Sequence, residues 1–161
     1  MKSLLFLASF FCFSNSYAQD SVKIKQIDSL VSIILHTTNL YTQRDSTVQD
    51  YPGIGLHMKT YITVMRYDKE VKKYSQIVKT TRQENQITKQ GVSGTAFYYD
   101  QNKLIKVEEF AMQDDKENKM TWYFEGDKCF FHSLQSDKAE DRVSLLLNLS
   151  HSILKQIAGS N

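Results

Sequence analysis

The hydrophobic residues of this chain repeat with one period near its two ends and with another in between. Over residues 22–35 they recur at three- and four-residue steps, the spacing of one face of an α-helix. Over residues 56–134 they largely alternate with polar residues, the spacing of one face of a β-strand. The helical spacing returns over residues 143–157. The order predicts a helix, a set of strands and a second helix.

Short turns connect the alternating segments. Residues 68–71, 100–102 and 126–127 leave room only for a direct return of the chain, which forces antiparallel pairing. Residues 41–53 are polar and end in Pro-Gly, so we expect a loop there, and we expect a polar connection at residues 83–91. The pattern predicts six strands in an antiparallel meander.

These elements define an α+β fold. The N-terminal helix is expected over about residues 20–40, with Asp20 or Ser21 as its cap. The C-terminal helix is expected to begin at a capping box of Asp137 and Glu140. Because each helix has one apolar stripe, we expect both to pack on one face of a curled sheet.

The start of the chain has the features of a secretory signal peptide. Lys2 provides a positive charge, the run "LLFLASFFCF" is apolar but too short to span a membrane, and Ser16 and Ala18 are small. We expect cleavage after Ala18, which removes residues 1–18 and leaves residues 19–161 as a single domain exported to the bacterial periplasm or beyond. No later stretch approaches the length of a transmembrane segment.

Charge and cysteine content limit the classes of partner. The chain has 20 Lys and Arg residues against 18 Asp and Glu residues, and this near balance gives no field to collect nucleic acid or an anionic membrane. With Cys12 in the signal peptide, Cys129 remains alone, so no internal disulfide is expected. Cys129 alternates with Phe131 and is expected to be a small buried residue.

No motif in the sequence predicts a metal or cofactor site. The acidic turn at Asp114, Asp115 and Glu117 could hold Ca²⁺ loosely, but a solvated turn explains it as well. The histidines lack metal-ligand neighbours at helical or hairpin spacing; they are His36, His57, His132 and His151.

No catalytic residue is assigned. Glu108 and Glu109 point to opposite faces of a strand and cannot act together on one substrate. An enzyme of the exported class, hydrolase-like, remains an alternative if the fold assembles its groups. It would need two members of one set within hydrogen-bond reach: His57, His132, Glu108, Glu109, Asp114 and Asp115.

Aromatic residues occupy both faces of the predicted sheet. Trp122 and Phe124 oppose Tyr123 on one strand, and Phe131 opposes Phe130 on the next. Three arrangements would cover the second face. The sheet curls and is partly wrapped by the loop before it, or it encloses an aromatic cavity, or it meets a partner that can be a second copy of the chain.

These observations predict a binding or interaction module that takes a small apolar ligand or a protein partner. A homodimer or a self-associating structural protein of the cell envelope remains an alternative. The aromatic candidates for the binding surface, with their polar handles, are Tyr98, Tyr99, Trp122, Tyr123, Phe124, Phe130, Phe131, His132 and Arg82.

Overall fold

The computed structural model of the protein describes residues 4–113, 116–134 and 136–159. The chain divides into two compact units, residues 1–36 and residues 37–161. Its described part contains two α-helices and one seven-stranded antiparallel sheet. The predicted α+β class is therefore confirmed.

The first helix, α1 (Leu4–His36), is longer than predicted. Asp20 and Ser21 lie inside it and do not cap its start, because the apolar residues before them also adopt helical structure. The cleavage after Ala18 and the packing of this helix on the sheet stay predictions. In the described chain, no helix is long and apolar enough to cross a membrane.

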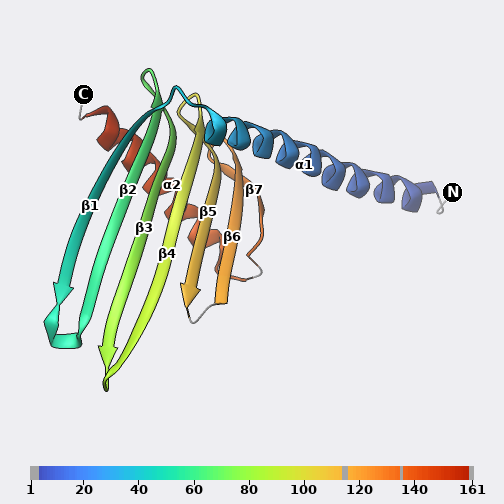
Figure 1. Ribbon diagram of the computed structural model, residues 1–161. Coiled ribbons are helices and arrows are strands. Elements are labelled where there is room, and N and C mark those ends of the chain that lie inside the picture. The colour runs from blue at the N-terminus through green and yellow to red at the C-terminus, as the bar shows by residue number, and fades with distance from the viewer. Residues whose placement is uncertain (1–3, 114–115, 135, 160–161) are drawn as a thin grey trace. The chain divides into compact units, whose positions relative to one another are not determined.

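The second unit contains the sheet, in which each strand pairs with its neighbours in sequence (Figure 1). The predicted antiparallel meander is confirmed, but the predicted count of six strands is wrong. The strands are β1 (Tyr41–Tyr51), β2 (Leu56–Tyr67), β3 (Glu70–Glu84), β4 (Ile87–Asp100), β5 (Lys103–Gln113), β6 (Lys116–Glu125) and β7 (Lys128–His132).

The additional strand is β1, where we predicted a loop. It pairs with the whole of β2, from Tyr41 opposite Arg66 to Tyr51 opposite Leu56, and a short 3₁₀ turn, η1 (Pro52–Ile54), joins the two. All eleven residues of β1 are exposed. A strand whose two faces both remain wet needs no alternation of apolar residues, so the pattern used to find strands is absent from it.

Two-residue turns close the hairpins. Gln101 and Asn102 have positive φ angles of 50° and 58°, and Gly126 has 61°, as suits the two predicted turns at these places. Asn85 and Gln86 do the same between β3 and β4, with φ of 50° and 65°. The polar connection predicted at residues 83–91 is therefore wrong: it is the tip of a long hairpin.

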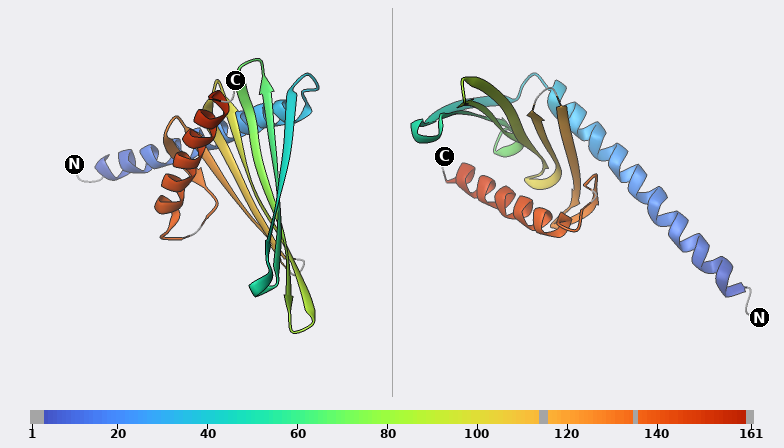
Figure 2. Two further views of the ribbon diagram at one scale, coloured as in Figure 1. Left: turned by 90° about the vertical axis from the view of Figure 1, so that its left-hand side faces the viewer. Right: turned by 90° about the horizontal axis from the view of Figure 1, so that it is seen from below.

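The second helix, α2 (Ala139–Ala158), lies across one face of the sheet, and Figure 2 shows the strands bending around it. The predicted capping box is wrong. Lys138 occupies the N-cap and makes no capping hydrogen bond with its side chain. Asp137 instead accepts a hydrogen bond of 3.1 Å from the Ser136 hydroxyl, whose oxygen accepts the Lys138 N–H at 3.2 Å.

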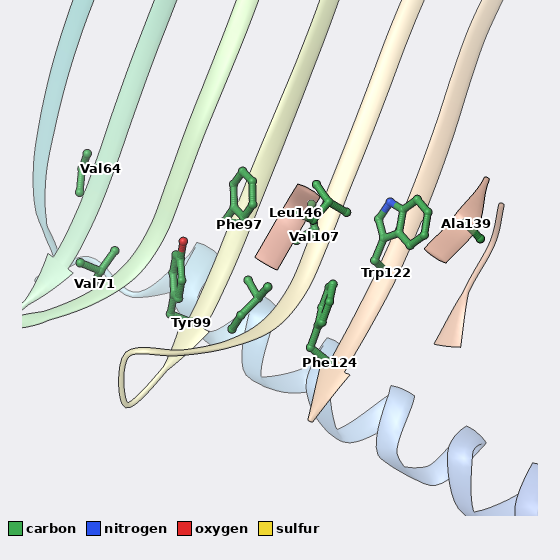
Figure 3. Packing of buried hydrophobic residues seen from close by; sticks show 10 residues of the cluster. Val64, Val71, Phe97, Tyr99, Val107, Trp122, Phe124, Ala139 and Leu146 are labelled. Atoms are coloured by element: carbon green, nitrogen blue, oxygen red, sulfur yellow. The ribbon is translucent and has the colours of Figure 1, made fainter. Parts of the chain in front are cut away.

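The core lies between α2 and the sheet face beneath it, which we call the helix-side face. One row of directly paired residues crosses the four strands β3 to β6 there and includes Phe97, Val107 and Trp122. Leu146 of α2 packs against these residues and is fully buried (Figure 3). Alternation along each strand places Tyr98 and Tyr123 on the opposite face, which we call the outer face.

Candidate ligand-binding site

The first half of α2 is fixed to the sheet by a buried polar cluster. Glu109 on β5 accepts hydrogen bonds from both the Nε and the Nη2 of Arg142, the former at 3.2 Å. Its Oε2 also accepts the indole N–H of Trp122 at 2.9 Å. These hydrogen bonds raise the pKa of Arg142 above its ordinary value, so the cation is secure.

Burial along α2 decreases toward its C-terminal end. Leu146 and Ser150 are 0% and 2% exposed, and the Ser150 hydroxyl donates to the phenol oxygen of Tyr99 at 3.4 Å. The next residues of the same apolar stripe, Ile153 and Ile157, are only half-buried. The stripe is therefore packed most tightly at Leu146 and Ser150, and no residue of α2 beyond Ser150 is fully buried.

Two adjoining hollows of the second unit lie beside the last turns of α2 and share Arg66 and Ile157. The larger has a volume of about 640 Å³ and the smaller about 230 Å³. Their apolar lining comes from β2, β3 and α2; it comprises Ile62, Val64, Val71, Tyr74, Ile153, Leu154, Ile157 and Ala158.

Two polar side chains of these hollows, Arg66 and Asn102, make hydrogen bonds that hold them in place. The Arg66 Nη2 donates to Gln43 Oε1 at 3.0 Å, which ties β2 to β1 across the smaller hollow. Asn102 Oδ1 accepts a hydrogen bond from the Val71 N–H at 2.9 Å. This bond joins the β4–β5 turn to the start of β3 beside the larger hollow. The arrangement is an apolar space with a few fixed polar groups, the usual make-up of a small-molecule site.

Three of the predicted aromatic site residues belong to the core. Tyr99, Trp122 and Phe124 are at most 1% exposed and point to the helix-side face (Figure 3). Burial raises the pKa of the Tyr99 phenol to about 12, against the opposing effect of the Ser150 hydrogen bond. These rings support the helix above them, and they do not line either hollow beneath its end.

Two other predicted residues, Tyr98 and Tyr123, belong to a separate row on the outer face. Lys73, Tyr98, Lys106 and Tyr123 are paired directly across β3 to β6, so cations and rings alternate. The Lys73 Nζ lies 5.3 Å from the centre of the Tyr98 ring, and the Lys106 Nζ lies 5.2 Å from that of Tyr123. Burial, aided by the charge of Glu108, raises the pKa of Tyr98 well above its ordinary value.

The predicted residues on and beside β7 lie around this row. The rings of Phe130 and Phe131 have their centres 6.3 Å and 5.8 Å from the centre of Tyr123. His132 is exposed on the other side of β7, where its ring centre lies 5.2 Å from that of Trp122 and its Nδ1 is 2.9 Å from the Leu134 carbonyl oxygen.

Arg82 lies away from both groups of rings. It is exposed on β3 and lines a different hollow, of about 390 Å³, toward the β3–β4 turn. The structure therefore divides the predicted site residues into a core group, an outer row and a remote arginine. It does not bring all of them together.

The groups considered for catalysis are also separated. His57 lies on β2 and His132 on β7, with four strands between them. Glu109 faces the helix and Glu108 the outer face, as predicted, and Glu108 pairs with Lys106 at 2.8 Å. Asp114 and Asp115 lie outside the described residues. Among the residues that the structure does describe, no three His, Cys, Asp or Glu side chains gather where they could hold a metal ion.

Sequence reasoning missed the residues that line the hollows. Ile153, Leu154 and Ile157 carry the same periodic pattern as Leu146, so the sequence assigned all of them to the core. Arg66 ends an alternating strand and carried no signal of its own. The path of α2 across the sheet distinguishes these lining residues from Leu146. That path decides how much of each apolar side chain is covered by the strands.

Comparison with known proteins adds no relative. No protein-family model matches the chain, and neither a curated protein nor a solved structure matches it.

Proposed function

We propose that this chain is an exported binding module that holds a small apolar ligand between the last turns of α2 and strands β1 to β3. The observation that supports it is the pair of adjoining hollows under an apolar stripe that is only partly packed. The larger hollow lies within the range of about 300–1,000 Å³ typical of small-molecule sites.

The side chains that line the hollows favour a ligand that is mostly apolar and has one small polar end. Aliphatic side chains from two secondary-structure layers face each other, and Tyr74 adds one ring whose centre lies 6.2 Å from that of Phe97. Covering such surface with ligand removes it from water, which is the main favourable term for an apolar guest. The Arg66–Gln43 pair offers hydrogen-bonding groups at the boundary of the space.

Three of the aromatic residues that the sequence suggested for the binding surface support this proposal in a different way. The rings of Tyr99, Trp122 and Phe124 pack beneath the first half of α2 and fix its distance from the sheet. The space under the end of the helix is therefore preformed. Binding on the outer-face row, to a ligand or to a protein partner, stays a separate prediction.

The test uses N-phenyl-1-naphthylamine, a neutral apolar dye that becomes bright when it leaves water. Replacing Ile157 by Trp puts a large ring into the space that both hollows share. We expect the dye to bind the full chain and to lose at least about tenfold in affinity in I157W, because the volume is occupied.

The matched control is L149W, at a residue of the same helix that is 42% exposed and lines neither hollow. It should bind the dye like the unchanged protein. Equal affinity in all three proteins, with unchanged unfolding midpoints, would contradict the proposal. Native mass spectrometry of protein purified from its own envelope then identifies a bound natural ligand by its mass.

A further inference from the structure

The outer edge of β1 carries a second inference, which is independent of the ligand site. We propose that two copies of the chain associate edge to edge through β1, antiparallel, about a twofold axis at Thr47. The sheets of the two copies then join into one continuous sheet. The occupant of this edge is thus a second copy of this chain.

The first observation is that the edge is long and unprotected. β1 comes first in the strand order and runs for eleven residues in unbroken register with β2. Within Tyr41–Tyr51 there is no proline, no lysine and no bulge, three of the features by which proteins block an edge, and its charged residues are Arg44, Asp45 and Asp50. A strand of this kind presents a row of backbone donors and acceptors to another strand.

The second observation shows which backbone groups point outward. The Ser46 N–H donates to the Asp45 carboxylate at 2.7 Å and so does not belong to the ladder with β2. Backbone groups alternate in direction along a strand, so the even-numbered residues of β1 turn their N–H and C=O outward. Pairing with a second copy must therefore place even-numbered residues opposite even-numbered residues.

The third observation is charge complementarity, which selects one register. With Thr47 on the axis, Arg44 lies opposite the partner's Asp50, and the symmetry repeats this pair on the other side. Ser46 then lies opposite the partner's Val48. Of the registers that match outward groups, this one alone puts Arg44 opposite an acidic residue. Opposite charges in directly facing positions stabilise a sheet.

The side chains of β1 permit this arrangement on both faces. Asp45 lines the smaller hollow and so lies on the helix-side face, whereas Asp50 bonds to His57 at 2.5 Å on the outer face. When the strands pair, Ser46 donates to the partner's backbone in place of Asp45. The freed Asp45 carboxylate faces the amide of the partner's Gln49, and Thr47 faces the partner's Thr47, a favourable cross-strand pair.

A cysteine placed on the axis tests the register. At a non-hydrogen-bonded antiparallel pair the Cα atoms are about 4.5 Å apart, which a disulfide can bridge. In the full chain with Cys12 and Cys129 replaced by Ser, T47C should form a covalent dimer under mild oxidation. S46C is the matched control, because its Cα atoms would be more than about 7 Å apart. Faster cross-linking of S46C than of T47C would overturn the proposal.

Sedimentation velocity measures the association itself, without a cross-link. A pairing of this size should give a reversible dimer with a Kd on the order of micromolar. V48P removes an outward N–H while leaving the ladder with β2 intact, so it should weaken association by roughly tenfold or more. The buried Trp122 reports by its fluorescence that the fold is retained.

A charge exchange completes the test. R44D sets like charges opposite each other and should abolish the dimer, and R44D/D50R should restore it because both pairs are re-formed with reversed sign. The unchanged protein staying monomeric up to about 100 μM, a hundred times the expected Kd, overturns the proposal. Association of V48P equal to that of the unchanged protein does so as well.

Discussion

Arg142 and Glu109, 33 residues apart in the sequence, form a two-bonded ion pair that joins α2 to β5. The Glu109 side chain is 6% exposed and that of Arg142 is 38% exposed. The carboxylate therefore depends on the guanidinium and on the Trp122 indole for its solvation.

Replacing Arg142 by Met should lower the free energy of unfolding by about 2–3 kcal/mol. Loss of the cation leaves a buried carboxylate uncompensated, which costs about 3–5 kcal/mol for a fully buried pair and less here because Arg142 retains water contact. Urea unfolding followed by Trp122 fluorescence measures the change. K155M, on an exposed residue of the same helix, is the control. E109Q/R142M should be milder than R142M, and a double variant worse than the single one contradicts this account.

Replacing Gly94 by Ala should destabilise the sheet through Phe110. A Cβ at Gly94 would lie 2.5 Å from Phe110 Cε1 and 3.0 Å from the Gln76 carbonyl oxygen, so the ring must move off the strand beside it. We expect a loss of about 1–3 kcal/mol, as for other overpacked sites. Thermal unfolding of G94A and of G94A/F110L shows whether the smaller side chain recovers part of it. G53A, with no atom within 4 Å of the new Cβ, should be nearly neutral.

Glu108 should make the protein less stable in acid. Burial opposes its ionisation, but the hydrogen bond and charge of Lys106, together with the charge of Lys119 and the Tyr98 hydrogen bond, outweigh burial and hold the pKa of Glu108 below the ordinary 4.5. A lowered carboxyl pKa contributes stability that is complete above pH 4.5 and is lost as pH falls through the lowered value. Urea unfolding between pH 7 and pH 3 should therefore show a smaller acid loss in E108Q. E117Q, at an exposed glutamate, should follow the unchanged protein.

Tyr99 should make the stability of the protein depend on pH in alkaline solution. Its pKa is raised from 10.0 to about 12 by burial, so its contribution to stability is complete below pH 10 and is lost as pH rises through about 12. The ultraviolet difference titration between the unchanged protein and Y99F should show one phenol that ionises near pH 12. Ionisation of that phenol near pH 10 would mean that the ring is not buried as described.

The sequence predicted the elements that have a single buried side. The turn at Gln101 and Asn102 and the turn at Gly126 were found from their composition, and the stripe of α2 was found from its period. Ser150, four residues after Leu146 on the same face of the helix, is 2% exposed. These features depend on residues close together in the sequence, so local composition and periodicity were enough to predict them.

What the sequence did not predict depends on distant neighbours. β1 has no buried side and therefore no alternation, so nothing in its own residues separates it from a loop. The hollows depend on where α2 crosses the strands, which makes Leu146 core and leaves Ile157 half-buried. The aromatic residues lie on both faces of the sheet, as the alternation predicted: Trp122 and Phe124 face the helix, and Tyr123 faces the opposite side.

The strand order has a consequence for how the chain reaches this structure. Each strand pairs with the strand before it, so the sheet can assemble hairpin by hairpin, with little loop-closure entropy to overcome at each step. Among the described residues of the second unit, α2 packs against side chains from several strands, and it comes last in the sequence. Docking of this helix is then the step that converts a ribbon of hairpins into a closed core, and chains cut short before residue 139 would remain at that earlier stage.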